Sequence, residues 1–293
     1  MNQISLKVYS ENGMVLTACA PEAVSAVYHG TYQPGDRIAL GISELNRHYV
    51  IQLEDSMSPA IVYVRSPHIV FRVPAPAPAD TLPRAYSPKS FSGSCHIIRV
   101  RLASLEEIAA RRNLAFNPYD AQAAAAEQAA GKGIGFYPHA ASNVAATSPI
   151  FEPRTAIDGV LENEAHDAWP YQAWSNNRDP KAELTVEFGR QVTVDELRLT
   201  LRADYPHDSW WKNVTVRFSD GSHETLTLAM TAKSQAFSIK PRTVTSLTLC
   251  ELVKNDDPSP FTALTQIEAW GNEAADIQEK QHTEHSESLK DSL

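Results

Sequence analysis

Alternation of apolar and polar residues, the pattern of half-buried β-strands, recurs through the first hundred residues of the chain. Turn signals such as Gln33-Pro-Gly-Asp and the proline-rich stretch 74–83 separate these segments. Short strands with frequent turns predict a sandwich or jelly roll. The expected strands are Ile4–Tyr9, Arg37–Ile42, Tyr49–Leu53, Ile61–Val64, Ile69–Val73 and His96–Leu102.

The same pattern returns more clearly between Tyr137 and Gly271. Seven strands joined by short turns are what an antiparallel sandwich needs, so this half predicts a second sandwich. The expected strands are Glu183–Phe188, Glu196–Arg202, Asn213–Ser219, Thr225–Met230, Gln235–Ile239, Ser246–Leu252 and Thr265–Trp270.

A helical patch separates the two strand-rich halves. Ser104 can cap a helix that follows it, Glu107 stands at the capping-box position, and two arginines close the last turn. An alanine run at 121–130 can form a second short helix, and the glycines of 131–135 mark a flexible joint.

We therefore predict an all-β protein of two β-sandwich domains joined by a short helical linker. The domains span 1–103 and 137–272, the linker spans 104–136, and the polar tail 273–293 buries too little apolar surface to order itself. The role expected for the first domain is support, a second binding face or a dimer contact, which leaves a homo-oligomer open.

Composition and charge narrow the class of protein. The chain has 293 residues, of which 43% are hydrophobic and 21% charged, as in soluble globular proteins. The formal net charge is −9 and no basic stripe is present, which argues against a nucleic-acid partner. The three cysteines are far apart and form no Cys-x-x-Cys pair, so we expect free thiols rather than disulfides or a zinc–thiolate site.

The N-terminus has no long apolar stretch after a basic region. We therefore expect no signal peptide, no membrane span and no membrane partner, and the default location is the cytoplasm.

Candidate chemistry gathers in loops that antiparallel geometry places at one end of the second sandwich. Successive strands reverse direction, so alternate loops share an end. By this count the loops 159–181, 203–212, 231–234 and 254–261 lie together. They hold four of the five tryptophans, with histidine, asparagine and aspartate beside them.

This combination is typical of carbohydrate sites, because an aromatic ring stacks on the C–H face of a sugar while polar groups bind its hydroxyls. The candidate ligand-binding residues are Arg202, Asp204, His207, Asp208, Trp169, Tyr171 and Trp210. Structural alternatives stay open: the arginine and the aspartates can pair to brace the loop, and one of the adjacent tryptophans at 210 and 211 is expected in the core.

A succession of motifs resembles the coagulation-factor type C (discoidin) domain and, among its relatives, the family 32 carbohydrate-binding modules. The motifs are Ala156-Ile-Asp-Gly, Trp174, Leu184-Thr-Val-Glu-Phe-Gly, Phe218-Ser-Asp-Gly and Gln266-Ile-Glu-Ala-Trp-Gly. The resemblance covers about 135 residues, under half of the chain. It implies a jelly-roll, galactose-binding-like sandwich that binds ligands through loops at one end and catalyses nothing. The first domain resembles this type of sandwich more faintly.

The resemblance also implies a possible structural calcium ion, with Asp158 as one ligand. The family has a glutamate where this chain has Gln266, and the residues after Asp158 depart from the family's spacing. Loss of a carboxylate weakens a site for a hard cation, although Asn163 or Glu162 can compensate. The candidate metal ligands are Asp158, Asn163 and Gln266.

The sequence thus favours a non-catalytic protein that binds carbohydrate. Two alternatives remain. One is an adaptor or structural protein whose loop end binds a protein or lipid. The other is a glycoside-active enzyme using Asp204, His207 and Asp208, disfavoured because three such residues within five positions rarely converge on one bond.

Overall fold

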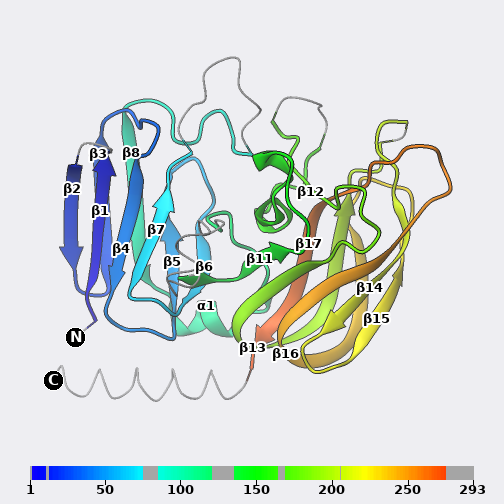
Figure 1. Cartoon of the computed structure of the whole chain (residues 1–293). Coiled ribbons are helices and arrows are strands. Elements are labelled where there is room, and N and C mark those ends of the chain that lie inside the picture. The colour runs from blue at the N-terminus through cyan, green and yellow to red at the C-terminus, as the bar shows by residue number, and fades with distance from the viewer. Residues whose placement is uncertain are drawn as a thin grey trace.

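The computed structural model describes residues 2–10, 13–74, 85–120, 135–163, 169–204 and 206–274. It is an all-β structure with two hydrophobic cores, and the two halves of the chain lie side by side (Figure 1). None of the helices in these ranges is long and apolar enough to cross a membrane. The expected helix at 121–130, most of the flexible joint after it and most of the proline-rich stretch lie outside the described residues.

The N-terminal half is a sandwich of two antiparallel sheets, with strand orders β2-β1-β4-β7 and β10-β6-β5-β8-β3. Alternate residues point inward, as in β3 with every second residue buried, and form one core. The strands are β1 Ile4–Ser10, β2 Gly13–Ala20, β3 Ala23–His29, β4 Arg37–Ile42, β5 Arg47–Gln52, β6 Ala60–Val64, β7 His68–Arg72, β8 Cys95–Leu102 and β10 Phe136–Tyr137.

All six expected N-terminal strands are confirmed, but the prediction missed β2, β3 and the two-residue β10. Edge strand β2 packs only half-buried residues, such as Leu16 and Ala18, against the core, and its outward face includes Val15, so its apolar alternation is weak. Strand β3 alternates, but its inward positions include Ala26 and its outward positions include Val27, which is 44% exposed, so the contrast between its faces is weak.

The predicted helix is confirmed as α1, Leu105–Ala109. Its capping box is formed: the backbone N–H of Glu107 donates to Ser104 Oγ at 3.3 Å, and that of Ser104 donates to Glu107 Oε2 at 2.8 Å. The expectation that two arginines close the last turn is wrong, because the helix ends before Arg111. Arg112 instead begins β9, Arg112–Asn113, which pairs with the C-terminal sheet.

The C-terminal half is one folded sheet that forms both layers of a sandwich. Strands β13 and β16 pair along their lengths, but β17 pairs only with residues 192–201 of β13, and β14 only with residues 247–254 of β16. Each long strand therefore contributes one limb to each layer. The elements are β11 His139–Ser142, 3-10 helices η1 Pro149–Phe151 and η2 Pro153–Ile157, β12 Trp174–Ser175, β13 Leu184–Leu201, β14 Trp211–Phe218, β15 His223–Thr227, β16 Gln235–Lys254 and β17 Ala263–Glu273.

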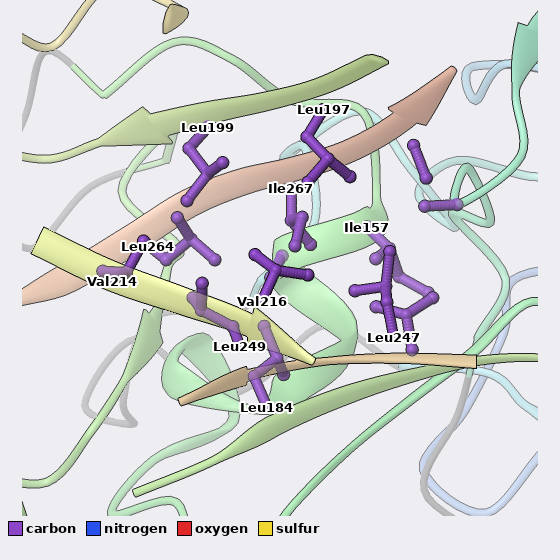
Figure 2. Packing of buried hydrophobic residues seen from close by; sticks show 14 of the residues in the cluster. Ile157, Leu184, Leu197, Leu199, Val214, Val216, Leu247, Leu249, Leu264 and Ile267 are labelled. Carbon is purple, nitrogen blue, oxygen red and sulfur yellow. The ribbon is translucent and has the colours of Figure 1, made fainter. Parts of the chain in front are cut away.

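The limbs of β13 and β16 match the four shorter strands expected from the sequence, so the prediction divided the chain where the strands turn the corner. Gly189 lies at one such corner with φ of +70°, and the ring of Tyr137 packs where a Cβ would stand. Between the layers, side chains such as Leu199 and Leu249 point toward one another (Figure 2).

The segment between the two sandwiches joins both of them. Leu114 and Ala115 belong to the C-terminal core, whereas Tyr119 and Phe136 belong to the N-terminal core. The predicted boundaries at 103/104 and 136/137 stay a prediction. The tail predicted from 273 begins later, because Glu273 ends β17 and both it and Ala274 are buried; residues 275–293 lie outside the described residues.

A buried ionic cluster, formed by Glu273, Arg190, Arg112 and His48, joins the two halves. The Glu273 carboxylate accepts hydrogen bonds from Arg190 at 2.6 and 2.9 Å and from Arg112 at 2.5 Å, and lies 3.0 Å from His48 Nε2 on β5. The Arg190 guanidinium also lies 5.4 Å from the ring centroid of Tyr63 on β6. This cluster fixes the far end of the C-terminal sandwich against the N-terminal one.

Candidate functional site

Three of the four loops predicted to share one end of the C-terminal sandwich meet there, and the place of 231–234 stays a prediction. Arg202 at the end of β13 donates to the carbonyl oxygen of Tyr171 at 2.7 Å. Ser209 N donates to the carbonyl oxygen of Phe261 at 2.7 Å, and Thr262 Oγ1 donates to Asn176 Oδ1 at 3.0 Å. The described parts of 159–181, 203–212 and 254–261 therefore form one rim.

Arg202 lies inside this rim rather than on it, with a side chain 2% exposed. Its Nε donates to Asp208 Oδ2 at 2.8 Å, and its guanidinium lies 4.6 Å from the ring centroid of Tyr171. Asp208 is also buried, and its backbone N–H donates to Asp204 Oδ1 at 3.2 Å. These contacts favour a structural role for Arg202 and Asp208, in which they brace the loop, over a direct role in ligand binding.

One guanidinium faces two carboxylates in this brace: Arg202 lies 2.8 Å from Asp208 Oδ2 and 3.5 Å from Asp204 Oδ2. Burial raises the pKa of Asp208, and Arg202 opposes that rise by stabilising the carboxylate. Ligand atoms of Asp204, His207 and Asp208 lie within 4.8 Å of one another. A metal ion at this cluster would have to approach the buried guanidinium, so it is electrostatically disfavoured. Asp208 is likewise engaged by Arg202 and poorly placed to act as a general base.

Outside the brace lies an exposed group, here called the rim patch: His207, Phe261 and Arg178. The His207 side chain is 53% exposed and Phe261 is 43% exposed. Their rings are stacked, with centroids 5.9 Å apart and an interplanar angle of 15°. The guanidinium carbon of exposed Arg178 lies 5.4 Å from the Phe261 centroid. The patch combines a partly exposed aromatic ring with two side chains that can donate hydrogen bonds.

The loops that carry the rim patch are held by hydrogen bonds. Ser259 Oγ donates to the carbonyl oxygen of His207 at 2.5 Å. Asp257 Oδ2 accepts from Ser209 Oγ at 2.6 Å and from Asn255 Nδ2 at 2.8 Å. Because the bonds of Ser259 and Ser209 cross between the two loops, they hold the backbones that bear His207 and Phe261 together.

Arg178 stands on a tight turn with an unusual backbone. Asn177 and Arg178 have φ values of +50° and +61°, a region that residues other than glycine rarely adopt. Buried Asn176 stabilises the turn: its Nδ2 donates to the carbonyl oxygen of Asp179 at 3.1 Å, and its Oδ1 accepts from Arg178 N at 3.3 Å. Strain of this kind is concentrated at functional sites.

The two tryptophans predicted to bind the ligand are less exposed than Phe261. Trp169 and Trp210 are half-buried, and Trp210 packs against the C-terminal core. Trp174 and Trp211 are core residues with ring centroids 6.1 Å apart, so the expected core member of the 210–211 pair is Trp211. Tyr171 is half-buried and meets Phe151 edge-on at 6.0 Å.

Sequence reasoning overlooked Phe261 and Arg178 as site residues. Phe261 belongs to a loop that was expected at the rim, and it directly follows the turn residues Pro258-Ser-Pro. A phenylalanine at such a place lies outside any expected strand, so its exposure could have been predicted from the sequence. Nothing in the residues around Arg178 shows that its guanidinium would lie over Phe261. Tyr205 and His166 lie outside the described residues.

The predicted calcium ligands do not fit a calcium ion. Gln266 Nε2 donates to Asp158 Oδ1 at 2.6 Å and to the carbonyl oxygen of Thr155 at 2.7 Å, while its Oε1 accepts from Gly159 N at 3.0 Å. Gln172 Nε2 also donates to Asp158, at 3.2 Å. Amide donors therefore face the carboxylate where a calcium ion needs oxygen atoms.

Asn163 is engaged elsewhere, since its Nδ2 donates to Thr265 Oγ1 at 2.9 Å and to the carbonyl oxygen of Leu201 at 3.2 Å. Burial raises the pKa of Asp158 to about 7. The Gln266 amide thus takes the place that a cation would have beside Asp158.

No family model matches the chain, and no curated protein matches it. Solved structures similar to part of it include chitosan-binding module 1 of a chitosanase/glucanase from Paenibacillus sp. IK-5, at 17% identity, with 55% of this chain and 99% of that chain covered and a TM-score of 0.36. Another is the family 32 carbohydrate-binding module of C. perfringens NanJ in complex with galactose, at 13% identity, coverage of 45% and 91%, and a TM-score of 0.34. A third is the family 32 module of Streptococcus pneumoniae EndoD, at 12% identity, coverage of 46% and 97%, and a TM-score of 0.37.

Proposed function

We propose that the chain is a non-catalytic carbohydrate-binding protein and that the rim patch is its sugar-binding surface. The observation that supports this is the exposure of Phe261 between His207 and Arg178 on a rim whose buried arginine and aspartate are paired with each other. The exposed ring offers a face for the C–H surface of a sugar. The imidazole and the guanidinium offer directed hydrogen bonds to its hydroxyls.

The hydrogen-bonded brace of the rim is suited to binding. The brace of Arg202, Asp208 and Tyr171 sets the loop geometry before a ligand arrives, which lowers the entropic cost of association. The enzyme alternative loses one of its three candidates, because Asp208 is buried and paired with Arg202.

A calorimetric titration with a panel of mono- and oligosaccharides tests the proposal. We expect a saturable ligand, and an affinity about tenfold lower in Phe261→Ala, because loss of one stacking contact costs roughly 1.4 kcal/mol. His207→Ala should weaken binding by a similar or smaller factor, because it removes one hydrogen bond and part of the stack.

Val70→Ala is the matched control, since Val70 is 48% exposed on β7 of the other sandwich and lies outside the rim. It should bind as the wild-type chain does. The proposal fails if no sugar binds, or if Phe261→Ala binds as tightly as the control. In the latter case a sugar site exists but not on the rim patch.

A further inference from the structure

The N-terminal sandwich has its own loop end, where buried polar groups have no arginine or lysine partner among the described residues. The β3–β4 loop, the β5–β6 loop and the described part of the β7–β8 connection converge there. Glu54 and His96 are 2% and 0% exposed, and His96 Nδ1 lies 3.0 Å from Glu54 Oε2. Asp55, next in the chain, is exposed.

One ligand-type atom from each of Glu54, Asp55 and His96 lies within 4.8 Å of the other two. The carboxyl groups of Glu54 and Asp55 hydrogen-bond to each other. Two carboxylates this close repel unless a proton or a metal ion lies between them. A proton or a metal ion bound at the cluster relieves this repulsion.

The other buried carboxylates in the described residues are stabilised in different ways: Asp120 pairs with His139 and Asp36 accepts a hydrogen bond from the backbone N–H of Gln33, whereas two others have arginine partners. Asp208 is paired with Arg202, and Glu273 with Arg190 and Arg112. Among the residues that the structure describes, neither Glu54 nor Asp55 makes an ion pair with arginine or lysine. Histidine, the basic partner that Glu54 does have, is also the commonest metal ligand.

An independent observation comes from Tyr32, whose side chain is 1% exposed. Its hydroxyl is buried and has no hydrogen-bond partner among the described residues. Its ring centroid lies 4.4 Å from that of His96 and 6.0 Å from that of Phe91. A buried unpaired hydroxyl costs about 1–3 kcal/mol, so its place beside the cluster indicates a missing partner.

We propose that Glu54, Asp55 and His96 bind a divalent transition-metal ion, with the Tyr32 hydroxyl placed to hydrogen-bond to a water or other ligand on that ion. One imidazole nitrogen and two carboxylate oxygens form a donor set that suits Zn²⁺ and its neighbours better than Ca²⁺, which prefers oxygen atoms alone. The exposed side of the cluster, at Asp55, gives the ion a path from solvent.

The same residues connect two loops. Backbone N–H groups of Ser56 and Phe91 donate to Glu54, and Ser56 Oγ donates to Ser90 Oγ at 2.9 Å. An ion bound at Glu54 would thus stabilise both the β5–β6 loop and the end of the β7–β8 connection. This site lies in the sandwich that does not carry the rim patch, so its existence does not depend on sugar binding.

The test is a Zn²⁺ titration by calorimetry of the full chain after removal of metals with a chelator. A Cys19→Ser/Cys95→Ser background removes the two exposed thiols, which would otherwise bind the ion. We expect a saturable site whose affinity falls on the order of 100-fold in Asp55→Asn and in His96→Gln. Zn²⁺ should also raise the unfolding temperature of the reference protein and not that of the variants.

Asp220→Asn is the matched control for loss of an exposed carboxylate, since Asp220 lies in the turn between β14 and β15. It should bind Zn²⁺ like the reference protein. If His96→Gln fails to fold, the exposed Asp55→Asn decides the question. No saturable site in the reference protein, or unchanged affinity in Asp55→Asn, would overturn the proposal.

Discussion

The loop ends of the two sandwiches differ in how their buried carboxylates are neutralised. At the C-terminal rim, Asp208 is held by the permanently charged Arg202, and the groups left at the surface are His207, Phe261 and Arg178. At the N-terminal loop end, the described neighbours of Glu54 are His96 and a second carboxyl group. A permanent cation turns a carboxylate into a structural element, whereas its absence leaves the carboxylate able to bind a proton or a metal ion.

The junction between the sandwiches extends this comparison, because Glu273 has three basic partners. We expect Glu273→Gln to have the largest effect, a loss of roughly 3–5 kcal/mol in the free energy of unfolding, since Arg190 and Arg112 would stay buried without their counter-charge. Urea unfolding followed by fluorescence measures it. Because the cluster joins the two halves, a single transition should separate into two.

Glu268→Gln is the control on the same strand, where the carboxylate accepts a hydrogen bond from the indole of Trp270 at 2.7 Å. Its cost should be about 1 kcal/mol. Equal costs for the two variants would contradict the role given to the junction.

The Glu273 carboxylate should also make the stability of the protein depend on pH in the acid range. Burial alone would raise the pKa of Glu273, but Arg190 and His48 lower it well below its ordinary value of 4.5. A depressed pKa contributes stability that is complete above about pH 4.5 and is lost as pH falls below that value. Wild-type stability should therefore fall in acid more steeply than that of Glu273→Gln, which can be measured by urea unfolding between about pH 3 and pH 6.

Asp208→Asn tests the rim brace and should have an intermediate effect. We expect a loss of about 2–3 kcal/mol in unfolding free energy, because an amide replaces the charge opposite buried Arg202. Sugar binding should weaken as well, since the loop that carries His207 loses its support. Asp256→Asn, at an exposed pair with Lys212, should change stability by no more than about 0.5 kcal/mol. If the brace contributes nothing, the two variants will be equally stable.

The smallest effect is expected for Glu54→Gln in metal-free protein. Burial, together with Asp55, raises the pKa of Glu54 to about 8, so the carboxyl group is mostly protonated at neutral pH. A glutamine of the same shape is then also neutral and can donate to Asp55, and the cost should be about 1 kcal/mol or less. Chemical denaturation in the presence of a chelator measures it. A loss as large as that of Asp208→Asn would remove the contrast between the two loop ends.

Local patterns in the sequence were sufficient for much of the fold. Alternation located β1, β4 and the limbs of β13 and β16, because burying one face of a strand demands it. The capping box at Ser104 and Glu107 located α1, because its hydrogen bonds are made within four residues. Strand β2, which buries none of its residues fully, has too weak an alternation to be detected in the sequence.

Reversal of antiparallel strands predicted that the loops 159–181, 203–212, 231–234 and 254–261 share one end, since that follows from strand count alone, and contacts join the described parts of all but 231–234. The sequence therefore determined which segments form the rim, but not which side chains face solvent. Arg202, expected at the surface, is buried beneath the rim, whereas Phe261, which was not expected to take part, is exposed on it.

Only the tertiary structure decided these matters, for a physical reason. Whether a charged side chain is buried depends on a counter-charge that can come from any distance along the chain. Arg202 meets Asp208 from only 6 residues away, but Glu54 meets His96 from 42 and Glu273 meets Arg112 from 161. Strand periodicity and turn chemistry act over a few neighbouring residues and so can be read in sequence; the pairing of buried charges requires the folded chain.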